Sequence, residues 1–301
     1  MANDKLKEIK GRTLISDADL KKPSVKLLYY FIFIFLVVGA LTTLMPFFWG
    51  FLSALKEPDR IFKIPPTFLP EPFTNPLKWN WKSYATAFTK IRYMKFFWNT
   101  IILAVGVWFF AIFPTALAGY ALAKLRMKYA QVFVLLFLAT LMVPFEAIFI
   151  PLLITVTKLG IRGTYWAIIL PAGVNAFNIF LFKSFFSEIP TSLMEAARID
   201  GAGELNIFFR IVIPLSQPIL AVITIFSFMG TWNDFFWPYL VLDNPDSYPI
   251  MVKLYDFQQQ AEVRWNEILA SLMIASVPPI ILFAFFQKQI MRGITLTGLK
   301  F

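Results

Sequence analysis

Six long apolar segments, separated by polar or proline-rich stretches, recur along this chain of 301 residues. Each approaches the roughly 20 apolar residues that a helix needs to cross a hydrocarbon layer about 30 Å thick. They span residues 27–49, 99–123, 132–153, 165–182, 218–242 and 268–286. The pattern predicts an all-α membrane protein with six transmembrane helices in a single domain, residues 27–286, flanked by tails at residues 1–26 and 287–301.

The composition supports a membrane protein, because 58% of the residues are hydrophobic and 35 are Phe. That is more apolar surface than one soluble core of this length could bury. The first apolar run is too long for a signal peptide and lacks a small-residue cleavage site after it. We therefore expect it to remain as the first span.

The basic residues predict which side of the membrane holds the termini. Seven lie in the tail before the first span: Lys5, Lys7, Lys10, Arg12, Lys21, Lys22 and Lys26. Three more follow the second span: Lys124, Arg126 and Lys128. Three others precede that span and weaken the asymmetry: Lys90, Arg92 and Lys95. Because basic loops favour the cytoplasmic side, we expect both termini there, together with the loop at residues 190–214.

The net charge of +10 does not indicate a nucleic-acid partner, because the basic residues are dispersed among loops and form no single strip with interleaved aromatics. Attraction to anionic membrane lipid accounts for it better. The chain contains no Cys and no His, so it has no disulfide framework and lacks the commonest metal ligand and proton shuttle. We predict no metal and no cofactor.

The first loop, residues 56–76, contains six prolines and therefore cannot be helical throughout. We expect an ordered, extended crossing outside the membrane. Trp81, Tyr84, Phe88 and Ile91 then recur at helical spacing, which predicts either a helix along the membrane interface or an amphipathic lead-in to the second span.

A polar segment broken by glycine follows the fourth span. Ser192 and Glu195 have the spacing of a capping box at the start of a helix, and Gly201 is suited to end it in a left-handed conformation. A second helix is expected over residues 204–212, broken by Pro214. The segment predicts a helix, a glycine turn and a second helix parallel to the membrane.

Leu193, Ala196 and Ala197 share one face of the first of these helices, which would let a partner approach closely. An ordinary loop could use Glu195 only as a cap and Gly201 only as a turn. It would not need an apolar ridge of small residues on the water side of a membrane, and such a ridge indicates a protein partner.

Glu195-Ala196-Ala197-x-x-Asp200-Gly201-Ala202, followed by Phe208, Ile211 and Pro214, resembles the EAA loop of ABC importer permeases. Further similarity, to the carbohydrate-importer branch and to the shorter subunit of the maltose-permease type in particular, lies in Trp232-Asn233-Asp234-Phe235, Trp237-Pro238 and Gln287-Lys288-Gln289-Ile290-Met291-Arg292-Gly293. The resemblance covers nearly the whole chain. The ending Thr295-Leu296-Thr297-Gly298-Leu299-Lys300-Phe301 departs from the Gly-Ala-Val-Lys-Gly more usual in the family, which bears on tail contacts with the ATPase.

The resemblance implies a type I importer permease fold with cytoplasmic coupling helices, in the cytoplasmic (inner) membrane of a bacterium. It implies a non-catalytic subunit for ATP-driven uptake of a disaccharide or short oligosaccharide. Its partners would be a second homologous permease, two ATPase subunits and an external solute-binding protein. The sequence is consistent with this division, since no Gly is followed by Lys and a Walker A loop is therefore missing.

By the family's mechanism, the loop at residues 190–214 sits in a groove on the ATPase, and closure of the ATPase turns the helices. Glu195 would pair with a basic groove residue. The small residues Ala196, Ala197, Gly201 and Ala202 would provide the close fit. The resemblance implies that the docking set also includes Asp200, Phe208, Ile211 and Pro214.

Polar residues inside the spans are candidates for the solute pathway, because burying them in a membrane is costly. They are Glu146 in the third span, Asn175 and Asn178 in the fourth, and Asn233 and Asp234 in the fifth, with Trp232 as a surface on which a sugar could stack. Hydrogen bonds between helices are the alternative role for such residues.

The polar loop at residues 243–267 contains a run of candidate binding-protein contacts: Tyr255, Asp256, Phe257, Gln258, Gln259 and Gln260. The resemblance implies that this external loop reaches into the binding protein. By composition alone it is a hydrated loop.

Three other functions are alternatives to a sugar-importer permease. An intramembrane zinc protease would need His-Glu-x-x-His, which a chain without His cannot supply. A self-sufficient secondary carrier would be expected to show paired half-repeats with interrupted helices, and Pro114, Pro144 and Pro278-Pro279 interrupt helices without any evident symmetry of two halves. A permease for another small solute remains the nearest alternative.

Overall fold

The computed structural model describes residues 22–125 and 127–297, so the predicted tail before residue 22 and the ending after residue 297 lie outside the described residues. The chain divides into two units, Met1–Asn80 and Trp81–Phe301. The first holds α2 (Pro23–Ala54) and the short turns η2 (Pro58–Arg60) and η3 (Pro76–Lys78). Within the described ranges the regular elements are all helical, which confirms the predicted all-α class.

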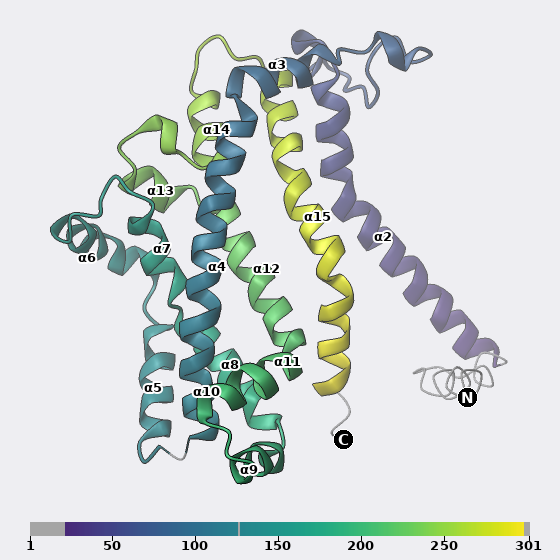
Figure 1. Cartoon of the computed structure of the whole chain (residues 1–301). Helices are drawn as coiled ribbons and strands as arrows, with labels where there is room; N and C mark the ends of the chain where they lie inside the picture. Colours follow the sequence, from purple (N-terminus) through teal and green to yellow (C-terminus); the bar gives the residue numbers. More distant parts are fainter. Residues whose placement is uncertain (1–21, 126, 298–301) are drawn as a thin grey trace. The chain divides into compact units, whose positions relative to one another are not determined.

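The second unit holds the remaining elements (Figure 1): α3 (Lys82–Ile91), α4 (Tyr93–Lys124), α5 (Ala130–Thr140), α6 (Phe145–Lys158), α7 (Trp166–Gly173), α8 (Ala176–Glu188), α9 (Thr191–Ile199), α10 (Glu204–Ile207), η4 (Phe208–Val212), α11 (Ile213–Leu215), α12 (Gln217–Asn233), α13 (Phe236–Val241), η5 (Pro245–Ser247), α14 (Ile250–Gln258) and α15 (Trp265–Thr297).

In the first unit, α2 is apolar on all sides and most of its side chains are exposed, as expected for a helix surrounded by lipid or by other spans. The loop after it is ordered by contacts of its own. Arg60 forms an ion pair with Glu71, and the indole nitrogen of Trp79 donates to the carbonyl oxygen of Pro72 over 3.1 Å. Only two short turns interrupt this extended segment, in agreement with its proline content.

In the second unit, α4 is the helix around which the others pack. It lies against α7, α8 and α12, and it contributes to all three apolar cores. Tyr93 and Phe96 lie in the core near its start, Leu103 and Val107 in the middle core, and Tyr120 in the core near its end. One helix therefore connects both ends of the unit.

The predicted interfacial segment forms α3, and Arg92 follows it in the left-handed region with φ 57°. Few non-glycine residues adopt that conformation. The chain turns sharply there, so α3 is a helix separate from α4, as one of the two sequence interpretations required.

Four described helices are long and apolar enough to cross a membrane: Pro23–Ala54, Tyr93–Lys124, Trp166–Glu188 and Trp265–Gln287. Two bent pairs raise the number to six if each pair counts as one span. The pairs are α5 with α6, bent by 98°, and Glu204–Leu215 with α12, bent by 82°. The six predicted spans thus have counterparts in the structure.

The third predicted span forms two helices, α5 and α6, with the interruption expected at Pro144. Pro144 follows the break between α5 and α6 and stands at the N-cap of α6, where a residue without an amide hydrogen costs least. By contrast, α4 continues through Pro114, and α15 continues through Pro278 and Pro279. The expectation that prolines interrupt the helices is therefore confirmed at Pro144 and wrong at Pro114 and at Pro278-Pro279.

Small residues allow α4 to approach its neighbours closely. A Cβ placed on Gly119 would lie 2.6 Å from the Cβ of Phe182 and 2.9 Å from the backbone nitrogen of Lys183. Both atoms belong to α8 and neither can rotate away. Gly119 is therefore required by the contact between two helices and not by its own backbone conformation.

We expect Gly119→Ala to destabilise the protein, because overpacking a closed contact costs about 1–3 kcal/mol. The melting temperature in detergent should fall by roughly 2–12 °C. The matched control is Gly39→Ala in α2, where an added Cβ meets no described atom within 4 Å. The control should melt no lower than the parent, and equal melting of both variants would contradict the close contact.

Candidate functional site

The loop after the fourth span folds as predicted into two short helices joined at glycine. We call residues 190–215 the elbow loop. Gly201 has φ +83°, its amide donates to the carbonyl of Arg198 over 3.0 Å, and the amide of Ala202 donates to the carbonyl of Ala197 over 2.9 Å. This pair of bonds is the Schellman arrangement that ends a helix with a left-handed glycine.

Two details of the elbow loop differ from the sequence interpretation. α9 begins at Thr191 with Pro190 at the N-cap, so Ser192 lies inside the first turn and the expected capping box does not form. The second helix does not end at Pro214. It widens into the π turn η4 and continues to Leu215, because proline is well tolerated near the first position of a new helical segment.

The predicted docking residues divide by burial. Five are exposed: Glu195, Ala196, Asp200, Gly201 and Pro214. Three are half-buried against the chain's own core: Ala197, Ala202 and Ile211. Phe208 is 1% exposed and packs against Tyr120 and Phe186. Phe208 therefore anchors the elbow loop to the core of the chain. This corrects the expectation that Phe208 faces a partner.

Three residues that shape this surface were missed by sequence reasoning: Met194, Ile199 and Leu205. Met194 is buried and holds α9 on the core, a role that its helical spacing to Ala197 could have indicated. Leu193, Ile199 and Leu205 are exposed, Ile199 at 86%. The elbow loop thus presents an apolar surface built from small residues and three larger ones, beside the carboxylates of Glu195 and Asp200.

The carboxylate of Glu204 connects the two halves of the elbow loop to α4. Its Oε1 accepts from Nε of Arg198 over 2.7 Å, and its Oε2 accepts from Nη2 of Arg198 over 3.3 Å. The hydroxyl of Tyr120 donates to Oε2 over 2.6 Å. The bonds from Arg198 and then from Tyr120 hold the pKa of Glu204 below its usual range. The carboxylate is therefore charged at neutral pH and loses its bonds only as the pH falls through that lowered pKa.

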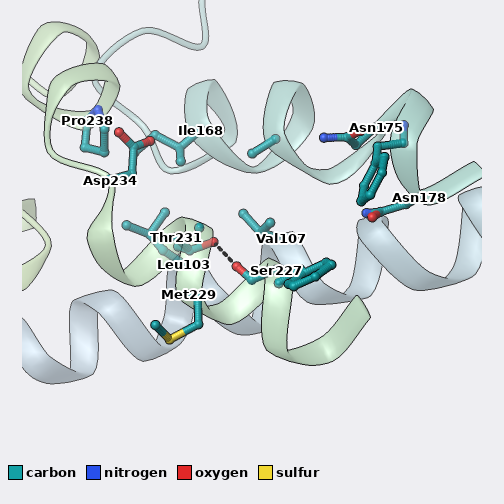
Figure 2. A pocket seen from close by; sticks show the side chains of 14 residues that line it. Leu103, Val107, Ile168, Asn175, Asn178, Ser227, Met229, Thr231, Asp234 and Pro238 are labelled. Atoms are coloured by element: carbon teal, nitrogen blue, oxygen red, sulfur yellow. Dashed lines mark hydrogen bonds between the residues drawn. The ribbon is translucent and has the colours of Figure 1, made fainter. Parts of the chain in front are cut away.

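A pocket of about 450 Å³ lies between α4, α7, α8, α12 and α13. Five of its lining residues are polar: Asn175, Asn178, Ser227, Thr231 and Asp234. Figure 2 shows the two asparagines toward one end and Asp234 toward the other, with Thr231 donating to the carbonyl of Ser227 over 2.9 Å. None of the lining residues carries a positive charge.

The structure brings together three of the six residues predicted for a solute pathway. Asn175, Asn178 and Asp234 line the same pocket. Asn175 also caps α8, since its Oδ1 accepts from the amide of Phe177 over 2.7 Å. Ser227 and Thr231 were missed, because a hydroxyl in an apolar helix usually bonds to the preceding turn and gives little signal.

The other three pathway candidates do not line the pocket. Trp232 is 1% exposed, stacks on Phe228, and donates from its indole nitrogen to the carbonyl of Ala275 over 3.1 Å. Asn233 donates to the carbonyl of Met229 over 2.9 Å within its own helix. Glu146 is exposed in the first turn of α6. The expectation that Trp232 offers a stacking surface to a sugar is therefore corrected, because its ring is buried.

The segment around Asp234 is held by tryptophans on both sides. Trp232 attaches the end of α12 to α15, and the indole nitrogen of Trp237 donates to the carbonyl of Ala167 in α7 over 2.9 Å. Between them, Oδ1 of Asp234 accepts from the amide of Trp237 over 3.3 Å. These bonds position the carboxylate at the break between α12 and α13.

The loop at residues 243–267 is not merely hydrated, because it contains α14, whose apolar side packs in the third core. Phe257 is 1% exposed and belongs to that core. Tyr255, Gln259 and Gln260 are exposed, and Asp256 and Gln258 are half-buried. The ring of Tyr255 lies 4.5 Å from Phe235 and 5.7 Å from Tyr239, measured between centroids. Tyr255 thus sits beside the segment that carries Asp234.

A helical membrane body with a polar pocket between its helices and an exposed, largely apolar loop is typical of a subunit for membrane transport. Residues 115–296 match the family described as binding-protein-dependent transport system inner membrane component, and the chain belongs to this family. Members are permease subunits of ABC importers. They do not hydrolyse ATP themselves, and they work with an ATPase and a solute-binding protein.

Named relatives agree with this family. The chain is 36% identical to the arabinooligosaccharides transport system permease protein AraQ of Halalkalibacterium halodurans, over 69% of this chain and 75% of that protein. It is 31% identical to the probable ABC transporter permease protein YurM of Bacillus subtilis, over 90% and 87%. It is 27% identical to the sn-glycerol-3-phosphate transport system permease protein UgpE of Yersinia enterocolitica, over 88% and 95%.

A solved structure has the same fold. It is a chain in the crystal structure of a bacterial ABC transporter involved in the import of the acidic polysaccharide alginate. The TM-score is 0.77 at 25% identity, and the match covers 89% of this chain and 98% of that one. The fold is therefore that of an ABC importer permease, as the sequence predicted.

We expect Gly201→Ala to loosen the elbow loop, because a left-handed conformation costs a residue with a Cβ about 1–2 kcal/mol. Amide hydrogen exchange over residues 194–207 should become roughly five- to thirty-fold faster. Gly203→Ala is the matched control, since Gly203 has φ −72° and its added Cβ meets no described atom within 4 Å. Equal exchange in both variants would mean that the left-handed turn does not stabilise the loop.

Proposed function

We propose that this chain is one of two permease subunits in a bacterial ATP-driven importer of neutral sugars, in the size range of a disaccharide or short oligosaccharide. The observation that carries the proposal is the pairing of a polar pocket between helices with an exposed docking loop in one unit. The pocket is the chain's share of the solute pathway. The elbow loop is its docking site for an ATPase.

The docking role rests on the exposed face of the elbow loop. Ala196 and Gly201 leave room for a partner's backbone, and Ile199 and Leu205 offer apolar side chains at its edge. Such a patch on the water side of a membrane is costly without a partner. Glu195 and Asp200 add negative charge that suits a groove lined by basic residues.

The choice of a neutral sugar rests on the chemistry of the pocket. Amides, hydroxyls and a carboxylate donate to and accept from sugar hydroxyl groups, and the volume of about 450 Å³ is in the usual range for small-molecule sites. Asp234 would repel an anionic solute, and no lining residue offers a compensating positive charge. AraQ, whose name refers to arabinooligosaccharides, is therefore a better guide than UgpE, whose name refers to a phosphate ester.

The exposed ring of Tyr255, with Phe235 and Tyr239, forms an aromatic cluster on the segments next to Asp234. Sugar faces stack on exposed aromatic rings. We assign this cluster, with Gln259 and Gln260, to the side that faces the binding protein, where it would receive solute for the pocket.

We place both termini and the elbow loop in the cytoplasm. The charge of the N-terminal tail supports this orientation. Within the second unit, the C-terminal end of α15 lies toward the same end as α9, whereas α3 and α14 lie toward the other (Figure 1). The apolar faces of α2 and α5 would then meet lipid and the second permease.

The proposal predicts stoichiometric companions. Affinity purification of the chain from its native membrane in mild detergent, followed by mass spectrometry, should recover an ATPase, a second permease and a binding protein. The binding protein's ligand would then identify the sugar. Recovery of the chain alone, still able to move solute in ATP-free vesicles, would instead indicate a secondary carrier.

Docking can be tested within the complex by Gly201→Asp, which adds charge and bulk at the exposed turn. We expect loss of the ATPase from the purified complex and loss of uptake. Gly160→Asp adds the same group at another exposed glycine with a left-handed φ of +69°, outside the elbow loop in the turn after α6, and it should retain the ATPase. Full ATP-driven uptake by Gly201→Asp would overturn the assignment of the elbow loop.

The pocket predicts that Asp234→Ala reduces sugar uptake by about tenfold or more, because a hydrogen bond to a charged group contributes about 1.5–3 kcal/mol. Asn233→Ala is the matched control, since this neighbouring side chain does not line the pocket and should leave uptake within about twofold, on the usual scale for exposed substitutions. Uptake would be measured in proteoliposomes that contain the whole importer. Equal uptake by the two variants would remove Asp234 from the pathway.

A further inference from the structure

The bonds around Glu204 join three helices at one carboxylate. Arg198 is in the last turn of α9, Glu204 is the first residue of α10, and Tyr120 is near the end of α4. Arg198 donates to both carboxylate oxygens of Glu204, and this bidentate pair spans the Gly201 turn. The third comes from a tyrosine that is 3% exposed.

We propose that Glu204 is a positioning residue for coupling, which transmits movement of the elbow loop to α4 through Tyr120. This inference rests on the proposed docking of the elbow loop on an ATPase. It adds that force leaves the loop by a second route besides the continuous chain into α12. The connection is a hydrogen bond and can be removed without changing the apolar packing.

Tyr120 is well placed to receive this movement. Its ring packs on Phe208, with centroids 5.4 Å apart, and it lies in the core beneath the elbow loop. A rotation of α10 therefore acts on Tyr120 both through the carboxylate and through the ring.

α4 then carries the movement toward the pocket. Val107 and Leu103 line the pocket, and Val107 is 13 residues from Tyr120 in an unbroken helix, a separation of about 20 Å at 1.5 Å per residue. α4 stays helical over this distance, although Pro114, which has no amide hydrogen, leaves one bond out of its backbone ladder. Movement at the elbow loop is thus expected at one wall of the pocket.

A second tie holds the start of the elbow loop to the same helix. Nζ of Lys124 donates to the carbonyl of Ile189 over 2.6 Å, directly before α9. The loop is therefore attached to α4 at its beginning and again at α10. The bond between Glu204 and Tyr120 attaches the part of the loop that follows the Gly201 turn.

A purely structural role for Glu204 would lower assembly of the complex without changing its coupling. The readouts are therefore the amount of ATPase recovered, the stimulation of ATP hydrolysis by loaded binding protein, and the solute moved per ATP in proteoliposomes. Tyr120→Phe removes one hydroxyl and keeps the buried ring. Tyr129→Phe is the matched control, because Tyr129 is 58% exposed and makes no contact with Glu204.

We expect Tyr120→Phe to assemble normally, and to lose about fivefold in both stimulation and solute per ATP, a typical size for coupling between sites. Tyr129→Phe should match the parent. Glu204→Gln should show the same loss, and the double variant should be no worse than the Glu204→Gln variant, since both changes break one connection. Normal coupling in Tyr120→Phe, or additive losses in the double variant, would overturn the inference.

A distance measurement tests the movement directly. The chain has no Cys, so Leu117→Cys in α4 and Asn206→Cys in α10 supply two exposed labelling sites for paired spin labels. The distribution of distances between the two labels should be narrow in both the nucleotide-free and the ATP-bound importer. In the Tyr120→Phe variant this distribution should broaden in the ATP-bound state. An unchanged distribution would contradict the connection.

Failure of the parent chain to recover an ATPase or to import with ATP would instead refute the proposed function.

Discussion

The close packing of α4 against α7, α8 and α12 is the constraint on which the second unit depends. Water is absent from the membrane interior, so apolar helices gain little from leaving lipid and associate mainly through fit and a few hydrogen bonds. Gly119 allows the backbone of α8 to reach α4. The same helix supplies Leu103 and Val107 to the pocket and Tyr120 to the core beneath the elbow loop. Its fit therefore decides the geometry of both sites.

Breaks in the other helices make the pocket polar. Asn175 stands where α7 ends and α8 begins, and Asp234 stands between α12 and α13. Irregular backbone is tolerated at membrane depth only where protein or a water-filled cavity satisfies it. The bonds of Trp232 and Trp237 to backbone carbonyls fix the position of the break at Asp234. Motion of the helices would change the pocket because three of its five polar residues, Asn175, Asn178 and Asp234, lie at or next to helix ends.

The elbow loop is built differently from the pocket. Its inner side, with Met194, Ile207 and Phe208, is buried in the core. Its outer side exposes small residues and three larger apolar side chains beside two carboxylates. A rigid body with an exposed contact surface can transmit force without changing shape. The carboxylate of Glu204 completes this body across the Gly201 turn, where the backbone alone would be free to bend.

Much of this protein was determined by the sequence alone. Apolar length predicts the spans, because a membrane imposes one thickness on every helix, and the pattern around Gly201 predicts the elbow, because only glycine enters a left-handed turn without strain. Contacts over long separations were decided by the tertiary structure. Trp232 and Phe257 were expected at binding surfaces and are buried. Ser227 and Thr231 line the pocket although no sequence pattern predicted it. Which face of an apolar helix meets a neighbour depends on its rotation, and a helix that is apolar on all sides carries no periodic signal of that rotation.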